Sequence, residues 1–368
     1  MDLKDLKLKQ VGYIMQSFMI DVKGETFKVP QSQFVQIDIF KEYETELYPM
    51  WYVCCNVPLW FYSKMVKNYD DIFVTMNLQM AKADTIDELL QMESGTTEIS
   101  GKFKCVIPYK SPVADETIQN EVEKQAEAYN ENYTFNEYAV VELALYNIAA
   151  YNASFNMINA VHTLTNMTDA ITYCYNQCSI SPVLMSKADN TKKYKEFKIL
   201  PESGIKNMLR IVEDYTFHDD HSTFFFDLTQ AYLVTNKIGC YAWRNNEHKQ
   251  VQILTLSEYS EGLGGFTGLH VDDKEKVTVI VADRQTVLAD ELNGAPAFTD
   301  TEETSFLRLT VRNGSLEILS PNKEYLITID AVNNASKING KYRLQALECT
   351  LIPEGEVFTP TFTLNFRR

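Results

Sequence analysis

The fold is decided by the stretch Pro201–Leu256, which reads PESGIKNMLRIVEDYTFHDDHSTFFFDLTQAYLVTNKIGCYAWRNNEHKQVQILTL. Its first part predicts one short helix, with Ser203 placed to cap the helix N-terminus. Four apolar side chains then recur at i, i+3, i+4 and i+7, the spacing that puts them on one helix face: Ile205, Met208, Leu209 and Val212. We expect this stripe to pack into a core.

The second part of the stretch changes to strand-like runs. Thr223–Leu228 and Gln230–Thr235 are rich in aromatic and β-branched residues, and Asn236–Gly239 is a turn signal. A short helix followed by strands carries no catalytic signature. It indicates an α+β protein that is mainly β.

Composition sets wide limits. A chain of 368 residues has room for two or three domains. Its aromatic content of 12% suits strands with half-buried surfaces. The formal net charge of −16 argues against non-specific binding to nucleic acid, which needs Lys and Arg to neutralise phosphates, and against adhesion to anionic membranes.

Neither a secretory signal nor a membrane span is expected. The first nine residues, MDLKDLKLK, are charged, and no apolar run approaches the roughly 20 residues of a spanning helix. The seven cysteines are scattered and odd in number, as expected of reduced thiols in a protein made in the cytosol. Cys174 and Cys178 could share a metal ion, but core packing is the favoured interpretation.

Residues 1–110 predict an N-terminal β-barrel. A short helix is expected at Pro58–Asn68, with proline at its start. Strands are expected at Tyr13–Val22, Gln33–Phe40, Pro49–Val57, Ile72–Ala81 and Gly101–Tyr109. In the second of these runs two sets of side chains oppose each other: Phe34, Gln36, Asp38 and Phe40 against Val35, Ile37 and Ile39. So many short strands in about a hundred residues favour a small barrel or sandwich.

Residues 111–200 predict a linker followed by a mixed α/β region. The polar, acidic run at 111–132 is a linker or an exposed helix. A strand is expected at Tyr138–Ile148. Asn156–Cys178 has helical spacing, and Thr168 before Asp169 can break it into two pieces. A polar loop near Lys187–Lys195 follows.

Residues 201–368 predict the helix described above and a second β-barrel with insertions. Asn313–Gly314 is a hairpin turn signal. Strands are expected at Val277–Ala282, Phe306–Arg312, Leu316–Ile318, Tyr325–Ala331, Tyr342–Ile352 and Thr359–Phe366.

Three polar motifs are candidates for chemistry, and each has a simpler interpretation. His218–His221 (HDDH) could hold a divalent ion, but a solvated turn is favoured because no further ligands follow at a defined spacing. Gly262–Gly268 (GLGGFTG) lacks the Lys and Ser or Thr of a phosphate loop. The acidic run Asp115–Glu131 is a solvated face rather than a glycosidase carboxylate pair.

The remaining histidines, His162, His248 and His270, stand alone, and His162 falls within the helical pattern. No serine-hydrolase, zinc-peptidase or cysteine-peptidase signature is present. The sequence therefore predicts no catalytic, cofactor-binding or metal-binding residues.

Three segments resemble the family of phage tail and baseplate hub proteins, which includes hubs of contractile tails and the N-terminal parts of tail-associated lysins. They are Gln33–Pro58 (QFVQIDIFKEYETELYPMWYVCCNVP), Ile158–Cys178 (INAVHTLTNMTDAITYCYNQC), and Ile199–Phe217 with Ser222–Thr235 (STFFFDLTQAYLVT). The resemblance covers most of the chain in outline.

The resemblance implies two small β-barrels that form a ring, as a homotrimer that imitates the sixfold tail tube. It implies a virion protein made in the host cytoplasm, with DNA passing through the lumen without specific binding. The implied partners are the tail tube or tape-measure protein and the tip and baseplate wedge proteins. Tail lysins carry a catalytic domain after the hub portion, whereas here the last predicted strand, Phe358–Arg368 (FTPTFTLNFRR), ends the sequence. A non-enzymatic subunit is therefore expected.

Three functions remain open at this point. The chain is a structural hub, a tail-associated cell-wall hydrolase, or a different baseplate component such as a wedge or receptor-binding subunit. Peptidoglycan hydrolysis would identify the second, and copy number and position in the particle would separate the first from the third.

Overall fold

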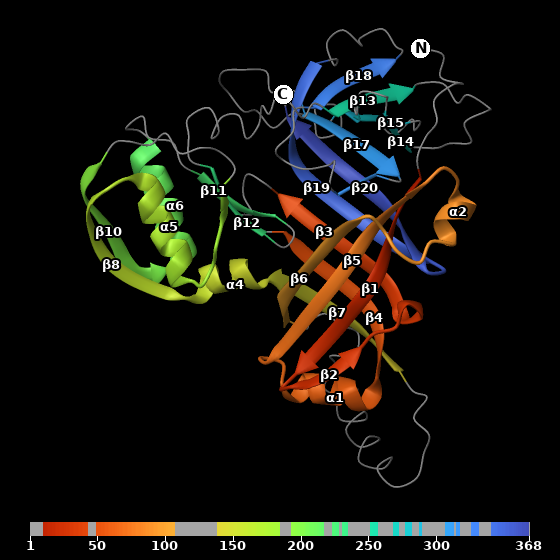
Figure 1. Ribbon diagram of the computed structural model, residues 1–368, viewed down its shortest axis with the longest axis horizontal. Coiled ribbons are helices and arrows are strands. Elements are labelled where there is room, and N and C mark those ends of the chain that lie inside the picture. The colour runs from red at the N-terminus through yellow and green to blue at the C-terminus, as the bar shows by residue number, and fades with distance from the viewer. Residues whose placement is uncertain are drawn as a thin grey trace.

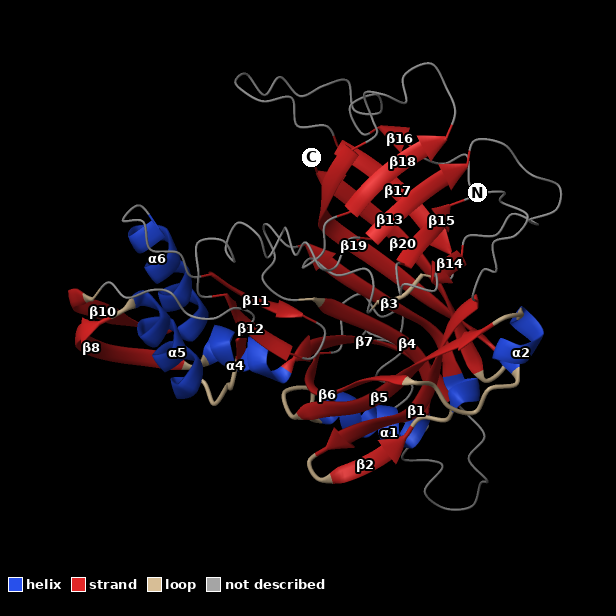
Figure 2. Ribbon diagram, turned by 45° about the horizontal axis from the view of Figure 1, so that its top comes forward, coloured by secondary structure: helices blue, strands red, loops and turns tan. Residues whose placement is uncertain are grey.

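The computed structural model describes residues 10–42, 49–106, 138–184, 193–216, 223–227, 230–234, 251–256, 268–271, 277–281, 287–288, 306–312, 314–316, 325–330 and 340–367. These residues form a mainly β protein with few helices, as the sequence predicts. A tall β structure runs from the α1 end to the β18 end, and a smaller α/β unit lies beside it (Figures 1 and 2).

Eight strands close into a barrel. In hydrogen-bonding order they are β19 (Gly340–Glu354), β3 (Phe34–Glu42), β4 (Met50–Pro58), β7 (Tyr138–Asn147), β6 (Thr97–Val106), β5 (Ile72–Ala83), β1 (Gln10–Val22) and β20 (Val357–Arg367). The pairing of β19 with β20 completes the ring. In Figure 1, β1, β5 and β6 cross β3, β4 and β7 at an angle.

The barrel does not coincide with the predicted unit of residues 1–110. That segment supplies β1, β3, β4, β5 and β6, whereas β7 and the hairpin β19–β20 come from after residue 137. Alternating hydrophobicity marks each strand but does not say which strand pairs with which, so the predicted boundary at residue 110 divides strands that the structure joins.

Short elements cover the ends and sides of the barrel. The helix α1 (Leu59–Lys67) begins after Pro58 and buries Phe61, Tyr62 and Met65. The strand β2 (Glu25–Lys28) pairs with the end of β1, and a short 3-10 turn, η2, spans Gln31–Gln33. The helix α2 (Ile86–Leu90) starts with a capping box between Thr85 and Glu88, which satisfies two backbone N–H groups.

Side chains fill the barrel interior. An eight-stranded barrel is only wide enough for side chains, and here large rings occupy it. Trp51 packs on Phe103, and Phe34 packs between Phe18 and Phe358, with ring centroids 5.3–5.8 Å apart. All but Phe34 are fully buried, and Phe34 is 5% exposed. The barrel is therefore a packed core and not a channel.

The hairpin β19–β20 extends beyond the barrel and carries a second set of strands. These are β13 (Val251–Leu256), β14 (Gly268–Val271), β15 (Val277–Val281), β16 (Val287–Leu288), β17 (Phe306–Arg312) and β18 (Tyr325–Asp330). They continue the sheet in the order β14–β15–β13–β18–β19 on one side and β20–β17–β16 on the other. Figure 2 shows them above the barrel.

Each hairpin strand changes its neighbour where the two sets of strands meet. β19 pairs with β18 at Gly340–Tyr342 and with β3 from Ala346 onward. β20 pairs with β1 at Phe358 and with β17 from Thr361 onward. Pro360 stands at this second change, where a residue without an N–H group interrupts the ladder least. No pairing joins β14 to β16 within the described residues, so the second barrel stays a prediction.

The side unit is formed by the described residues between 148 and 234. It contains α4 (Ile148–Phe155), β8 (Met157–Thr165), α5 (Met167–Gln177), β9 (Val183–Leu184), β10 (Tyr194–Ser203), α6 (Gly204–Thr216), β11 (Thr223–Asp227) and β12 (Gln230–Val234). β8 pairs with β10, and β12 pairs with β11 and β9. The unit has its own core, in which Ile171, Tyr175, Met208 and Phe226 are buried. It leaves the barrel at the end of β7, where α4 begins (Figure 1).

The predicted helix at 156–178 is wrong in its first half. Residues 157–165 form β8, which pairs with β10 from Thr165–Tyr194 to Met157–Ser203. β-branched residues at Ile158, Val161 and Thr163 favour a strand, and the pairing with β10 decides it. The predicted break is confirmed, although the N-cap of α5 is Asn166, whose side chain accepts from the backbone N–H of Asp169. His162 accordingly lies on a strand.

The predicted strand at Gln230–Thr235 and the helix in 201–216 are confirmed in place, but the helix buries a different stripe. Gly204, Asn207, Met208 and Ile211 face the core of the side unit, whereas Leu209 is 42% exposed. Ile205 and Val212 pack only partly against that core. The apolar spacing is compatible with two neighbouring stripes on the helix. Gly204 lies so close to Cys178 that a Cβ atom would not fit between them, and this contact turns the stripe that contains Gly204 toward the core.

Among the described helices, none has the length and apolar character that crossing a membrane would require.

Candidate assembly surface

The outward side chains of β7, β4, β3 and β19 make an apolar wall on the barrel. Ile37 and Ile39 face inward and Gln36, Asp38 and Phe40 face out, so the two sets lie on opposite faces, as predicted. A bulge between Phe34 and Gln36 departs from the predicted alternation. It turns Phe34 into the core and leaves Val35 46% exposed.

We call this surface the outer wall. It is defined by the outward residues Val35, Asp38, Phe40, Met50, Tyr52, Cys54, Tyr138, Val140, Glu142, Tyr146, Glu348, Thr350 and Ile352. Several are large and exposed: Phe40 by 38%, Tyr138 by 50%, Val140 by 46% and Ile352 by 47%. Single exposed apolar residues are ordinary, whereas a contiguous set on neighbouring strands marks an interaction surface.

Contacts across neighbouring strands hold the outer wall in shape. The rings of Phe40 and Tyr52 meet edge to face with centroids 5.6 Å apart. The Asp38 carboxylate accepts from Thr350 Oγ1 at 2.7 Å and from Gln36 Nε2 at 2.6 Å. These contacts join β4, β3 and β19, so the wall is a pre-formed surface.

Its charges are acidic. Asp38, Glu142 and Glu348 lie on the wall, and within 34–42, 50–58, 138–147 and 346–354 the sequence has one basic residue, Lys41, which is buried. Burial raises the pKa of the Cys54 thiol, and the Glu142 and Asp38 carboxylates raise it further. Both carboxylates therefore lie near the Cys54 thiol, which faces outward between them.

The side of the barrel formed by β1, β5 and β6 is polar by contrast. Its outward positions include Ser17, Thr75, Asn77, Gln79, Glu98, Ser100 and Lys102. Asn77 Nδ2 donates to Glu98 at 2.9 Å across β5 and β6. The barrel exterior is therefore amphipathic, with the apolar half on β7–β4–β3–β19.

The described cysteines are held as thiols. Burial raises the pKa of Cys174 to about 12, with the neighbouring Cys178 adding to the effect. Burial also raises the pKa of the other buried thiols, Cys55, Cys105, Cys178 and Cys349. Reactive cysteines need a lowered pKa, so these six groups have the opposite character.

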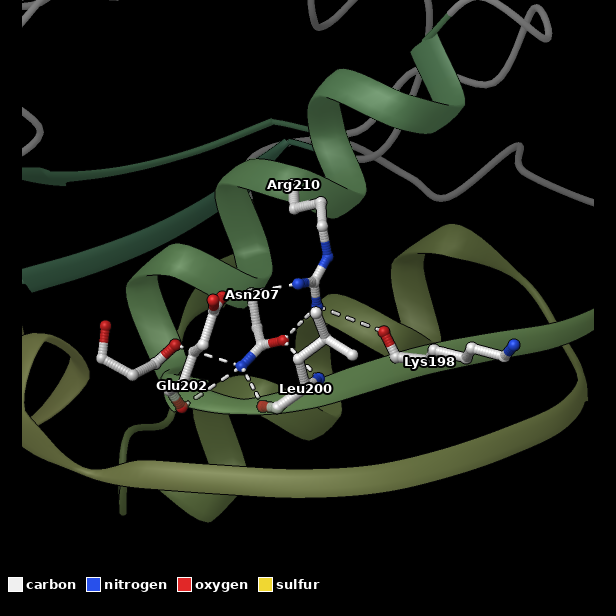
Figure 3. Close-up of polar contacts among 6 residues, drawn as sticks. Lys198, Leu200, Glu202, Asn207 and Arg210 are labelled. Carbon is white, nitrogen blue, oxygen red and sulfur yellow. Dashed lines mark hydrogen bonds and ion pairs between the residues drawn. The ribbon is translucent and has the colours of Figure 1, made fainter.

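A second polar centre lies in the side unit, around Asn207 on α6 (Figure 3). Asn207 is fully buried. Its Oδ1 accepts from the backbone N–H of Leu200 at 2.9 Å, and its Nδ2 donates to the carbonyl oxygens of Leu200, Glu202 and Ser203 at 3.0–3.3 Å. The amide thus substitutes for a neighbouring strand at the irregularity of β10 between Ile199 and Glu202.

Arg210 closes this centre from the solvent side. Its guanidinium donates to Asn207 Oδ1, to the Lys198 carbonyl oxygen at 3.2 Å and to the Glu202 carboxylate at 3.4 Å. Every polar atom of the Asn207 side chain is therefore used within the chain, which makes the centre a structural clamp. Its one mark in the sequence is Pro201, which the structure places in β10, followed by an asparagine in the next helix.

The structure places only some of the sequence candidates. Cys174 and Cys178 lie in the core of the side unit, which confirms the packing interpretation. His270 lies on β14, and His162 lies on β8. His218–His221, His248, the acidic run 115–131 and the glycine loop up to residue 267 are outside the described residues. Within the residues that the structure does describe, no group of His, Cys, Asp or Glu could hold a metal ion.

A family model described as "Bacteriophage PBS1 gene 109 protein" matches residues 3–283, about three quarters of the chain. The chain belongs to this family. It is therefore a member of a family of bacteriophage proteins, in keeping with the resemblance seen in the sequence. No curated protein matches the chain by sequence.

The chain is also similar to several solved structures. A 43 kDa tail protein of prophage MuSo2 from Shewanella oneidensis is 8% identical, with 95% of this chain and 96% of that chain covered and a TM-score of 0.45. A tail protein from Neisseria meningitidis MC58 is 12% identical, with 97% of each chain covered and a TM-score of 0.43. No residue role is carried over at these identities.

A third similar structure is the Escherichia coli c3393 protein, described as a type VI secretion component with structural similarity to the T4 tail proteins gp27 and gp5. It is 9% identical, with 94% of this chain and 76% of that chain covered and a TM-score of 0.46.

Proposed function

We propose that the chain is a structural subunit of a phage tail, the hub that joins the tail tube to the tip, and that it works by assembly without catalysing a reaction. The observation that carries the proposal is a packed barrel with an apolar outer wall in a member of a bacteriophage protein family. A pre-formed apolar surface on a rigid barrel suits a lasting contact between subunits.

The filled barrel interior supports an assembly in which several copies surround a central lumen. Because rings such as Trp51 and Phe103 occupy the barrel, DNA has no path through it. A conduit built from this chain would have to lie between copies, as in a homotrimer arranged around a lumen. The formal charge of −16 suits such a lumen, since like charge discourages DNA from sticking.

The chemistry of the described side chains supports a non-enzymatic role. Six cysteines have raised pKa values, and the most elaborate polar centre, around Asn207, is saturated by contacts within the chain. The expected partners are the tail tube or tape-measure protein, the tip and the baseplate wedge proteins, and the expected location is the virion tail.

Imaging the assembled particle with this chain located tests the proposal. One to three copies on the central axis would support a hub. Six or twelve copies at the periphery would instead indicate a wedge or receptor-binding subunit. If the chain hydrolyses purified peptidoglycan, it is a cell-wall hydrolase and the proposed non-enzymatic role is wrong.

A further inference from the structure

We infer that β8 in the side unit accepts an extended segment of a different tail protein as a third strand of the β8–β10 sheet. The segment lies along the open edge of β8, which is the edge of this strand that does not face β10. The inference rests on the proposed function, because it gives the subunit a specific way to hold a neighbouring protein of the tail.

Side chains of α6 close the outer edge of β10. The Asn207 amide bonds both the backbone N–H and the carbonyl oxygen of Leu200, and Arg210 donates to the carbonyl oxygen of Lys198 (Figure 3). Pro201, the next residue in the strand, has no N–H group to offer. A further strand therefore cannot pair with β10 on this side.

The register shows which backbone groups of β8 remain open. In an antiparallel pair, residues bond the neighbouring strand alternately, and residues across from each other share the same state. Lys198 directs its carbonyl oxygen to α6 and not to β8, and it stands across from Val161. Val161, and Asn159 two residues before it, therefore direct their N–H and C=O groups away from β10. Within the part of the chain that the structure describes, β8 pairs only with β10, and no other hydrogen bond uses these groups.

The side chains of β8 leave this edge unprotected. Native sheets commonly guard an edge with charged residues, proline or a bulge. The nine residues of β8 (MINAVHTLT) include no Asp, Glu, Lys, Arg or Pro, and the extra residue at the irregularity of the pair lies on β10. Met157 and Val161 are 68% and 64% exposed. Phe155, just before the strand, is 66% exposed and stacks on Tyr151 with ring centroids 4.5 Å apart.

These features define the occupant. Open N–H and C=O groups in a row require the backbone of an extended chain, and the exposed Met157 and Val161 favour apolar side chains at alternate positions of that chain. A second copy that used its own β8 would form a twofold pair, which the expected trimeric ring does not contain. Figures 1 and 2 both show β8 and β10 on the side of the unit turned away from the barrel, where a different protein can reach them.

Hydrogen exchange measured on the full chain and on the assembled particle tests the open edge. In the free chain the N–H groups of Asn159 and Val161 should exchange fast, whereas that of Ala160, which pairs with Ile199, should exchange slowly. In the particle all three should exchange slowly, because the added strand bonds the first two. Fast exchange at 159 and 161 in the particle would overturn the inference.

A proline at the open edge gives a second test. Val161→Pro removes an N–H group that the folded chain does not use, so the variant should fold, whereas the added strand loses a hydrogen bond and meets the proline ring. Its incorporation into particles should fall at least about tenfold. Val161→Thr keeps the N–H group and the branched shape and should incorporate normally. Normal incorporation of the proline variant would overturn the inference. If that variant melts early, the exchange measurement decides alone.

Photo-cross-linking in the particle identifies the occupant. A benzophenone side chain in place of Met157 should link to an extended segment of a different tail protein. A link to another copy of this chain would overturn the inference. A chain imaged on the tail axis with an open β8 edge would overturn strand addition and leave the hub function standing. A chain imaged at the periphery with a protected edge would do the reverse.

Discussion

The hydroxyl oxygen of Tyr13 accepts a hydrogen bond at 2.8 Å from the backbone N–H of Leu316, 303 residues further along the chain. Tyr13 is fully buried in the barrel, and Leu316 is 2% exposed in the same core. The preceding residue, Ser315, lies with its hydroxyl 3.0 Å from the sulfur of Met80 on β5. The segment after β17 thus packs into the barrel, so the N-terminal strands and the C-terminal third share one core.

Tyr13→Phe tests that connection. It keeps the ring in place and leaves the Leu316 N–H buried without this acceptor, which should lower the free energy of unfolding by about 1–3 kcal/mol. Tyr69→Phe is the matched control, because Tyr69 is 69% exposed and should change stability by less than about 0.5 kcal/mol. Urea denaturation measures both. Equal stability of the two variants would mean that the bond contributes nothing.

Asn207→Ala should be among the most damaging changes in the side unit. It leaves the Leu200 N–H and three carbonyl oxygens near α6 without their amide partner and removes an acceptor from Arg210. We expect a loss of about 3 kcal/mol or more in the free energy of unfolding. Asn159→Ala on the exposed side of β8 serves as the control and should be nearly neutral. A mild effect at position 207 would show that water replaces the amide.

The two stripes of α6 can be told apart by paired substitutions. Ile211→Asp places a carboxylate in the core of the side unit, where Ile211 is 2% exposed, and should cost several kcal/mol. Leu209→Asp, two residues earlier, replaces a side chain that is 42% exposed and should cost less than about 1 kcal/mol. Melting temperatures measure the difference. The reverse order would restore the stripe predicted from spacing alone.

These residues show where sequence reasoning succeeds and where it stops. The strands at 13–22, 34–40, 50–57 and 72–81 were predictable because each alternates or is continuously apolar. Their closure with β7, β19 and β20 was not, since strand partners hundreds of residues apart leave no local signal. Residues 157–165 had helical spacing and became a strand because β10 lies beside them.

The candidate surfaces were predictable only in part. Alternation predicts that Asp38 and Phe40 share a face opposite Ile37 and Ile39, and the structure confirms it. Their proximity to Glu348 and Ile352 depends on the pairing of β3 with β19, which the sequence does not show. The bulge that exposes Val35 contains no glycine or other turn residue from which it could be predicted. The Asn207 centre depends on an irregularity in β10 that only the folded backbone reveals.

Alkaline pH should destabilise the protein. Burial holds the pKa of Cys174 at about 12 in the folded chain, against an ordinary value of 9.0. Because the pKa is higher in the folded chain than in the unfolded chain, the free energy of unfolding is unaffected by this thiol below pH 9. It falls as the pH rises from 9 towards 12, where the unfolded chain loses the proton and the folded chain keeps it. The slope approaches about 1.4 kcal/mol per pH unit for each such thiol. Denaturation between pH 8 and 11 measures it, and Cys174→Ala should show a shallower fall. Parallel slopes would argue against burial of this thiol.

The seam between β1 and β20 carries the last prediction. The two strands are in register at a single residue pair, Tyr13 with Phe358, so packing must hold the closure of the barrel here. Gly12 allows it, because a Cβ atom at this position would lie 2.4 Å from Cγ1 of Val357 and 3.0 Å from Cδ2 of Leu89, both fully buried. Gly12→Ala should therefore overpack the seam and cost about 1–3 kcal/mol.

A double-mutant cycle with Val357→Ala isolates this contact. Removing the Val357 methyl groups costs stability by itself, but it also makes room for the new Cβ atom at position 12. The double variant should therefore be more stable than the sum of the single losses predicts, by at least about 0.5 kcal/mol. Urea denaturation of the four proteins measures the coupling. Strictly additive losses would mean that β1 and β20 do not meet at these residues, and that the barrel is closed by other contacts.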